Sequence, residues 1–176
     1  DPVLCVLGIG IRNRLPAHDG KAQTIVHGGV RKVDPPEAVA AAIVEIRALQ
    51  PGDCCGVKVF MGASTGNMLV DDPRTLELIF AACPTLIATH CEDTPTIKAN
   101  EERFRQQYGE DVPFSAHPLI RSEEACYKST VLATTLARSH GTRLHVLHIS
   151  TAKELELFEP GPLITNQGGK RITAEV

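Results

Sequence analysis

The sequence predicts an α/β fold in which parallel strands alternate with helices. Short apolar stretches with the length of buried strands recur at 56–61, 86–90 and 144–149. Segments with helix-start signals separate them, and strands joined by helices pair in parallel through right-handed crossovers. The chain has 176 residues, whereas a (β/α)8 TIM-type barrel needs about 250. We therefore expect an incomplete portion of such a barrel.

The first helix is expected from Asp34 to about Leu49. Asp34 is the predicted N-cap, Pro35 lies in the first turn and Glu37 occupies the third position. Before this helix the pattern is less regular, and residues 3–7 are a candidate strand. The expected order at the start of the chain is therefore strand, then helix.

The strand at 56–61 follows a turn at 51–53 that contains Pro and Gly. Because side chains alternate along a strand, Lys58 and Phe60 are expected to face away from Val57 and its apolar neighbours.

The later elements are predicted from the same signals, namely cap residues at helix starts, glycine at helix ends and apolar runs for strands. They are a helix from Asp72–Pro73, a strand over 86–90, a helix from Thr94 to Tyr108, a helix from Ser122 to Gly141, a strand over 144–149, a helix over 151–158 capped by Ser150, and a last strand over 172–176.

Composition excludes several partners. The net charge is −3 and no Lys/Arg-rich tract with interleaved aromatic residues occurs, which argues against nucleic acid. No stretch approaches the ~20 apolar residues that span a bilayer, and the first residues do not form a signal sequence, so a soluble cytoplasmic protein with no membrane partner is expected. The six cysteines lack metal-knuckle spacing and are expected to be reduced. An opened barrel exposes strand edges, so self-association into a homo-oligomer is also expected.

Lys58 stands within an apolar strand, where a buried ammonium is costly. The pKa of such a lysine falls, and its neutral amine can capture carbon dioxide as a carbamate. A carbamate is a carboxylate on a long arm that can bridge two metal ions in a hydrolytic site. The alternative is a lysine that extends to the barrel rim or pairs with an acid.

His90 closes the next apolar strand and is followed by Cys91, Glu92 and Asp93. Strand ends of this kind build the active sites of α/β barrels. A neutral imidazole there can bind zinc, and the neighbouring acids can orient it. The alternative is a histidine whose hydrogen bonds are satisfied for purely structural reasons.

His145 and His148 lie three residues apart. In an extended strand they face opposite sides, so we expect at most one to reach a shared site, and His148 is preferred because it is nearer the C-terminal strand end. The other histidines are expected to be solvated or structural: His18, His27, His117 and His140.

Five stretches together resemble dihydroorotase of the amidohydrolase superfamily, in the expected order and over about residues 45–176. They are GVKVFMGASTGNMLVDD at 56–72, ATHCEDTPTI at 88–97, HPLIRSEEACY at 117–127, HVLHISTAKEL at 145–155 and the terminal KRITAEV. The resemblance implies a cyclic amide hydrolase that interconverts dihydroorotate and N-carbamoyl-aspartate in pyrimidine biosynthesis, with a small-molecule substrate. It also implies two zinc ions bridged by carboxylated Lys58, with His90 and His148 as terminal metal ligands.

The chain departs from the family in two places. No His-x-His pair occurs, and the aspartate that the family carries on its last strand as ligand and general base is absent. No catalytic residue is therefore assigned, and the isolated chain is expected to have little or no turnover. Residues 1–44 do not match the family, so the expected organisation is a poorly matched segment at 1–44 and a partial amidohydrolase barrel domain at 45–176.

Two other functions remain open. The run GVKVFM at 56–61 also resembles the hydantoinase and dihydropyrimidinase branch of cyclic amidohydrolases. The other function is that of a scaffold subunit, an amidohydrolase-like protein without catalysis. Turnover of each ring type and stoichiometric metal content would separate the three.

Overall fold

The computed structural model describes residues 5–7, 26–27, 36–50, 53–54, 56–62, 69–165 and 168–176. The described residues of the first half form three short strands and two helices: β1 Cys5–Leu7, β2 Val26–His27, α1 Pro36–Arg47, β3 Val57–Phe60 and α2 Pro73–Ala82. The rest comprises β4 Leu86–His90, α3 Thr94–Tyr108, the 3-10 helix η1 Phe114–Ala116, α4 His117–Ile120, α5 Glu123–His140, β5 Arg143–Val146, the 3-10 helix η2 Lys153–Leu157, β6 Ile164–Thr165, β7 Gly168–Gly169 and β8 Ile172–Ala174.

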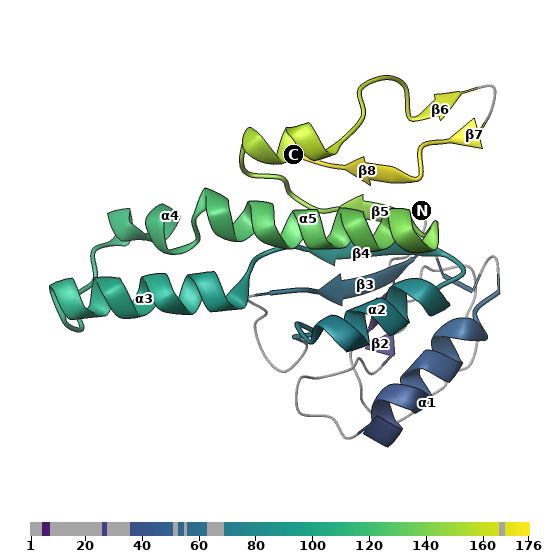
Figure 1. The fold of residues 1–176 in the computed structure, drawn as a ribbon, viewed down its shortest axis with the longest axis horizontal. Helices are drawn as coiled ribbons and strands as arrows, with labels where there is room; N and C mark the ends of the chain where they lie inside the picture. Colours follow the sequence, from purple (N-terminus) through teal and green to yellow (C-terminus); the bar gives the residue numbers. More distant parts are fainter. Residues whose placement is uncertain are drawn as a thin grey trace, which may run out of the picture.

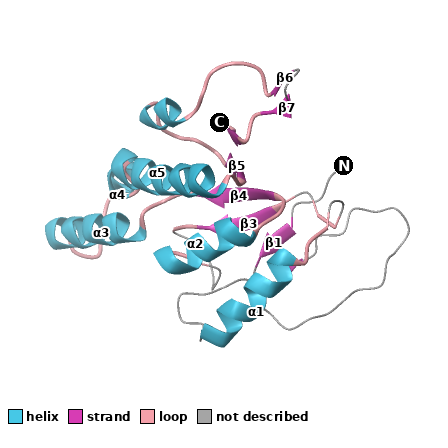
Figure 2. Cartoon of the chain, turned by 45° about the vertical axis from the view of Figure 1, so that its right-hand side comes forward, coloured by secondary structure: helices cyan, strands magenta, loops and turns pink. Residues whose placement is uncertain are grey.

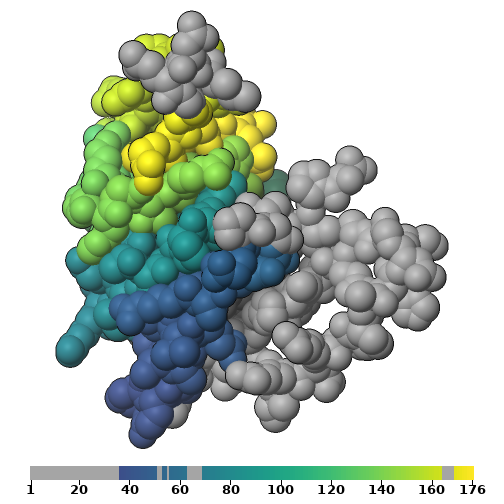
Figure 3. All heavy atoms as spheres, turned by 90° about the vertical axis from the view of Figure 1, so that its right-hand side faces the viewer, coloured from purple at the N-terminus to yellow at the C-terminus, as the bar shows by residue number. Residues whose placement is uncertain are grey.

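The main sheet has six strands in the order β2-β1-β3-β4-β5-β8, and every neighbouring pair is parallel. From β3 to β5 each strand is followed along the chain by helical structure before the next strand (Figure 1). This arrangement confirms the predicted α/β fold with parallel strands. In the space-filling view α1 lies at the bottom, the middle of the chain above it, and the residues after β5 at the top (Figure 3).

Helices cover one face of this sheet, as two views agree (Figures 1 and 2). The core lies between that face and the apolar sides of α1, α2 and α5. Leu76 and Phe80 of α2 are each only 1% exposed, and Ile87 of β4 is 0% exposed. Burial of such side chains contributes roughly 1.5–3 kcal/mol each, so this interface holds the layers together.

Local signals fix several helix ends where they were predicted. The Asp72 carboxylate accepts a hydrogen bond from the Thr75 N–H at 2.8 Å, and Ser122 caps α5 in the same way through the Ala125 N–H. Gly141 ends α5 with φ 64°, a left-handed conformation that glycine adopts without cost. The predicted strand at 86–90 and the helix from Thr94 to Tyr108 are confirmed.

Other expectations are corrected. The helix predicted to reach Leu49 ends at Arg47, and its predicted cap Asp34 lies outside the described residues. Ser150 does not cap a helix: its hydroxyl donates to the His148 carbonyl at 3.1 Å, and the segment forms the 3-10 helix η2 instead. Within the described part of the chain, no helix is long and apolar enough to cross a membrane.

Candidate active site

The face of the sheet opposite the helices carries a row of side chains from four strands. In the register of the ladder Lys58 pairs with Ala88, Ala88 with His145, and His145 with Thr173. Because directly paired residues of a parallel sheet point to the same side, Lys58 and His145 share this face. His90, two residues beyond Ala88, shares it as well.

Lys58 is buried within this row, with 6% of its surface exposed. Its ammonium lies 4.7 Å from the centre of the Phe60 ring. Burial lowers the pKa of Lys58 to about 8, although interactions with Cys91 and Glu175 oppose the shift. The neutral amine expected from the sequence is therefore accessible near neutral pH. The role of Lys58 as a metal ligand stays a prediction.

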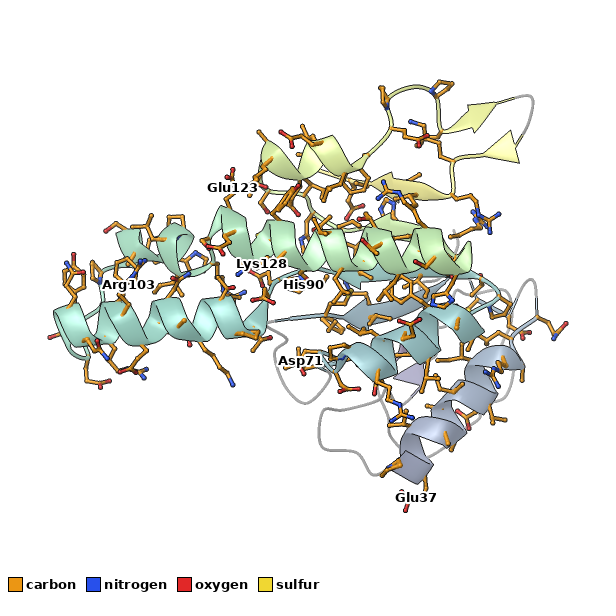
Figure 4. The ribbon with its side chains drawn as sticks, in the orientation of Figure 1. Glu37, Asp71, His90, Arg103, Glu123 and Lys128 are labelled. Atoms are coloured by element: carbon orange, nitrogen blue, oxygen red, sulfur yellow. The ribbon has the colours of Figure 1, made fainter. Side chains whose placement is uncertain are left out.

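His90, the last residue of β4, meets His148, which lies two residues beyond the end of β5. His90 Nδ1 lies 3.0 Å from His148 Nε2, and the ring centres are 4.8 Å apart. Figure 4 shows His90 where the strands end and α3 begins. The structure thus brings together two of the three predicted ligands, which lie 58 residues apart in sequence.

A backbone turn makes this meeting possible. The strand predicted over 144–149 ends at Val146 instead, and His148 has φ 41°, a left-handed value that residues other than glycine rarely adopt. The assumption that His145 and His148 share one extended strand is therefore wrong. His145 stays in the ladder, where its Nδ1 lies 2.9 Å from Thr173 Oγ1 and its Nε2 lies 3.4 Å from Glu175.

The two facing nitrogens fit two positions of a metal site. Zinc bound by imidazoles at about 2.0–2.1 Å in tetrahedral geometry separates the nitrogens by roughly 3.3 Å, close to the 3.0 Å between His90 Nδ1 and His148 Nε2. Across the described ranges, no three His, Cys, Asp or Glu side chains form a group that could hold a metal ion. Further ligands must therefore be other groups, such as a modified lysine, or come from outside these ranges.

Glu92 and Arg121 complete the polar network. Glu92 Oε2 lies 2.8 Å from His90 Nε2 and also accepts a hydrogen bond from the Arg121 guanidinium. Burial alone would raise the pKa of Glu92, but the hydrogen bonds from His90 and Arg121 outweigh it and hold the pKa below its ordinary value. An anionic carboxylate therefore lies behind His90.

Sequence reasoning named the acids that follow His90, Glu92 and Asp93, as groups that can orient it, but missed Arg121. The arginine follows the four-residue helix α4 and reaches an acid 29 residues earlier in the chain. Its only signal in the sequence was its place in the stretch HPLIRSEEACY, which was recognised for family resemblance and not for chemistry.

A hollow of about 300 Å³ lies over this network. Its walls come from the ends of β4 and β5 and from α4, α5 and η2. The lining residues are His90, Cys91, Glu92, His117, Arg121, Cys126, Leu147, His148, Ser150 and Glu154. Polar and ionisable groups thus converge at the C-terminal side of the sheet, where α/β barrels build active sites.

Close backbone packing holds the end of β3 against this site. A Cβ added to Gly62 would lie 1.5 Å from the Glu92 carbonyl oxygen, so no other residue fits there without displacing the backbone. The Met61 N–H donates to the His90 carbonyl at 2.9 Å. The positions of His90 and Glu92 therefore depend on glycine at position 62.

The remaining histidines and cysteines lie apart from the network or at its edge. His117, expected to be solvated or structural, stacks on Phe114 with ring centres 5.9 Å apart. It also lines the hollow. His140 pairs with Glu77 at 2.9 Å on the surface. Cys54, Cys83, Cys91 and Cys126 are free, as expected, while the side chains of His18 and His27 lie outside the described residues.

The L-hydantoinase of Paenarthrobacter aurescens is 30% identical over 126 residues, a match that covers 68% of this chain and 27% of that protein. The chain is similar to a segment of the hydantoinases. It spans about a quarter of the length of the relatives it matches. No protein-family model matches the chain.

Solved structures agree on the fold. The L-hydantoinase (dihydropyrimidinase) from Arthrobacter aurescens superposes with a TM-score of 0.57 and 28% identity over 65% of this chain and 26% of that one. A D-hydantoinase gives 0.58 with 21% identity over 67% and 26%, and the dihydropyrimidinase from Brevibacillus agri NCHU1002 gives 0.54 with 22% over 66% and 25%. The predicted portion of a TIM-type barrel is confirmed.

The comparisons also refine the resemblance seen in the sequence. They support a partial match to the hydantoinase and dihydropyrimidinase branch of cyclic amidohydrolases, which was the alternative, better than dihydroorotase, which was preferred. The stretch GVKVFM carried that alternative.

Proposed function

We propose that the chain is a segment of a metal-dependent cyclic amidohydrolase that opens a small ring such as a hydantoin or a dihydropyrimidine. The observation that carries the proposal is the 3.0 Å approach of His90 Nδ1 to His148 Nε2 at the ends of β4 and β5. Similarity to an L-hydantoinase supports this class of ring. A hollow of about 300 Å³ is of a size that suits a small molecule.

Zinc is the metal we propose, since imidazole nitrogens and carboxylate oxygens are its usual ligands. When bound, a zinc pair polarises the amide carbonyl and lowers the pKa of a bound water to about 7. His90 and His148 would hold the metal through the two facing nitrogens, and Lys58 would bridge as a carbamate. Glu92 would accept the Nε2–H of His90, which keeps the imidazole oriented.

The chemistry of Lys58 follows from its burial. With a pKa of about 8, about one amine in ten is neutral at pH 7. Its Nζ lone pair can form a bond to the carbon of carbon dioxide, and the nitrogen then loses a proton to solvent. The product is an anionic carbamate, and bound metal ions would offset the cost of its buried negative charge.

The test is hydrolysis by the complete protein, because this chain contains neither a His-x-His pair nor a matching aspartate. We expect turnover of hydantoin or dihydrouracil in the presence of zinc and bicarbonate. His148→Ala should abolish it, whereas Glu77→Gln, a surface change beside His140, should leave it intact. Absence of turnover on every cyclic amide in zinc-loaded protein would contradict the proposal.

Dihydroorotate is the second candidate substrate. The stretches around 64–67 and 117–127 resemble dihydroorotase more closely than hydantoinase. In the same assay, a kcat/KM for dihydroorotate at least tenfold above that for hydantoin would favour this reading. A scaffold protein without catalysis remains distinguishable, because it would bind no zinc at a stoichiometric level.

A further inference from the structure

Four side chains form a continuous hydrogen-bonded chain at the end of the sheet. The Arg121 guanidinium donates to Glu92 Oε2, and the same oxygen lies 2.8 Å from His90 Nε2. On the other side of the imidazole, His90 Nδ1 lies 3.0 Å from His148 Nε2. Each nitrogen of His90 thus has a different kind of partner.

We propose that Glu92 and Arg121 are positioning residues that hold His90 as its Nε2–H tautomer and so aim the Nδ1 lone pair toward His148. The purpose of this arrangement rests on the proposed function, since the unprotonated His90 Nδ1 is ready to bind a metal ion, while His148 Nε2, which donates to it in the metal-free protein, would release its hydrogen on metal binding. The arrangement itself is a property of the metal-free protein.

The tautomer follows from what each group can do. An ionised carboxylate has no hydrogen to donate, so the nitrogen that contacts Glu92 must carry the proton. A neutral imidazole has a single N–H, so protonation of Nε2 leaves Nδ1 as an acceptor. Arg121 keeps its charge at every physiological pH and holds the carboxylate in one place.

The surrounding structure anchors both Glu92 and Arg121. Asn100 of α3 donates from Nδ2 to the Ile120 carbonyl at 3.1 Å, which holds the residue before Arg121. The Asp93 N–H donates to the Ala125 carbonyl at 2.9 Å and ties the residue after Glu92 to α5. Glu92 and Arg121 therefore meet beside His90 from two anchored segments.

Two other histidines of the chain show that an acid alone does not make this arrangement. His140 Nε2 lies 2.9 Å from Glu77, and His145 Nε2 lies 3.4 Å from Glu175. Both carboxylates are more than half exposed, at 57% and 54%, whereas the Glu92 side chain is 10% exposed. Among the described residues, neither of the exposed acids is paired with an arginine.

The imidazole nitrogens can be observed directly by NMR of metal-free protein labelled with 15N-histidine. We expect His90 to show a protonated Nε2 and an unprotonated Nδ1 as a single tautomer. Glu92→Gln should convert His90 to a mixture of tautomers, because the amide can donate as well as accept. Arg121→Met should have the same effect, and Arg121→Lys should restore most of the single tautomer.

Glu77→Gln is the matched control and should leave the His90 signals unchanged. Protonation of His90 at Nδ1 in the unaltered protein would overturn the proposal without any variant having to fold. An unchanged His90 tautomer in a folded Glu92→Gln protein would overturn it as well.

Cobalt binding separates this inference from the proposed function. Partners that orient a metal-ligating histidine typically contribute about 10–100-fold to metal affinity, so Glu92→Gln should weaken cobalt binding by a factor in that range, and Glu77→Gln should not. If His90 shows the expected tautomer but the protein binds no cobalt, the metal-dependent function is contradicted and the positioning of His90 by Glu92 is supported. If NMR of the metal-free protein shows His90 protonated at Nδ1 and the same protein still binds cobalt through His90, the role of Glu92 is contradicted but the metal-dependent function is not.

Discussion

The two faces of the sheet differ in what their side chains do. On one face, Ile87 and Leu144 are 0% exposed and pack against helices. On the other face, Lys58 is also buried but has an ionisable amine, and the His145 ring contacts the Thr173 hydroxyl. Successive residues of the same strand point to opposite faces. One residue therefore packs in the core, and the next contributes to the polar face. Substitutions on neighbouring residues should therefore have very different effects.

The largest effect is expected from Leu144→Ala on the helix-covered face. Removal of a fully buried leucine side chain destabilises by about 2–5 kcal/mol. His145→Ala, one residue along on the other face, should cost about 1 kcal/mol through the loss of hydrogen bonds. Urea unfolding of the two variants measures both values. Equal losses would show that the two faces do not divide as described.

The next largest effect is expected from the titration of Lys58. Loss of its proton should increase the free energy of unfolding, whereas Leu144→Ala should decrease it. The folded pKa is about 8 against an ordinary value of 10.5, so between these pH values the unfolded chain binds more protons. The free energy of unfolding should therefore rise with pH, by roughly 3 kcal/mol from below pH 8 to above pH 10.5. Urea unfolding of metal-free protein without bicarbonate, across this range, measures the rise.

Lys58→Met is the control for that prediction. It removes the titrating group and keeps a long side chain, so the rise attributed to Lys58 should disappear and stability at pH 7 should increase. A variant that retains the full rise would show that other groups are responsible for it.

The smallest effect is expected at His148, whose φ of 41° is strained for any residue except glycine. His148→Gly and His148→Ala both remove the imidazole, so their difference isolates the backbone. We expect the glycine variant to be more stable by about 1 kcal/mol. Thermal unfolding compares them. The same pair at Ser150, where φ is not positive, should show no advantage for glycine, and an alanine variant at 148 as stable as the glycine variant would contradict the assigned strain.

The parts of this fold that could be predicted from sequence are those with local causes. Asp72 and Ser122 are side chains that cap the helix immediately following, and the strand at 86–90 is an apolar run with clear ends. Because these signals lie within a few residues of their effect, α2, β4, α3 and α5 were placed correctly, whereas η1 and α4 were not predicted.

The candidate site was only partly predictable because its contacts are long-range. The residue types and the strand ends made Lys58, His90 and His148 candidates, and the family resemblance implied their roles as metal ligands. The turn at His148 could not be foreseen, since an apolar run gives no sign that the strand stops at Val146. Arg121 was missed because a helix of four residues has no periodic pattern and its partner is 29 residues away.

The central claim is that side chains at the carboxyl ends of β3, β4 and β5 hold a zinc site. Anomalous diffraction at the zinc edge, from crystals of the complete protein grown with zinc and bicarbonate, tests it most directly. We expect an anomalous peak for zinc within bonding distance of His90 Nδ1 and His148 Nε2, and density for a carboxyl group on Lys58 Nζ. An unmodified Lys58 remote from any metal, with zinc absent from both histidines, would contradict it.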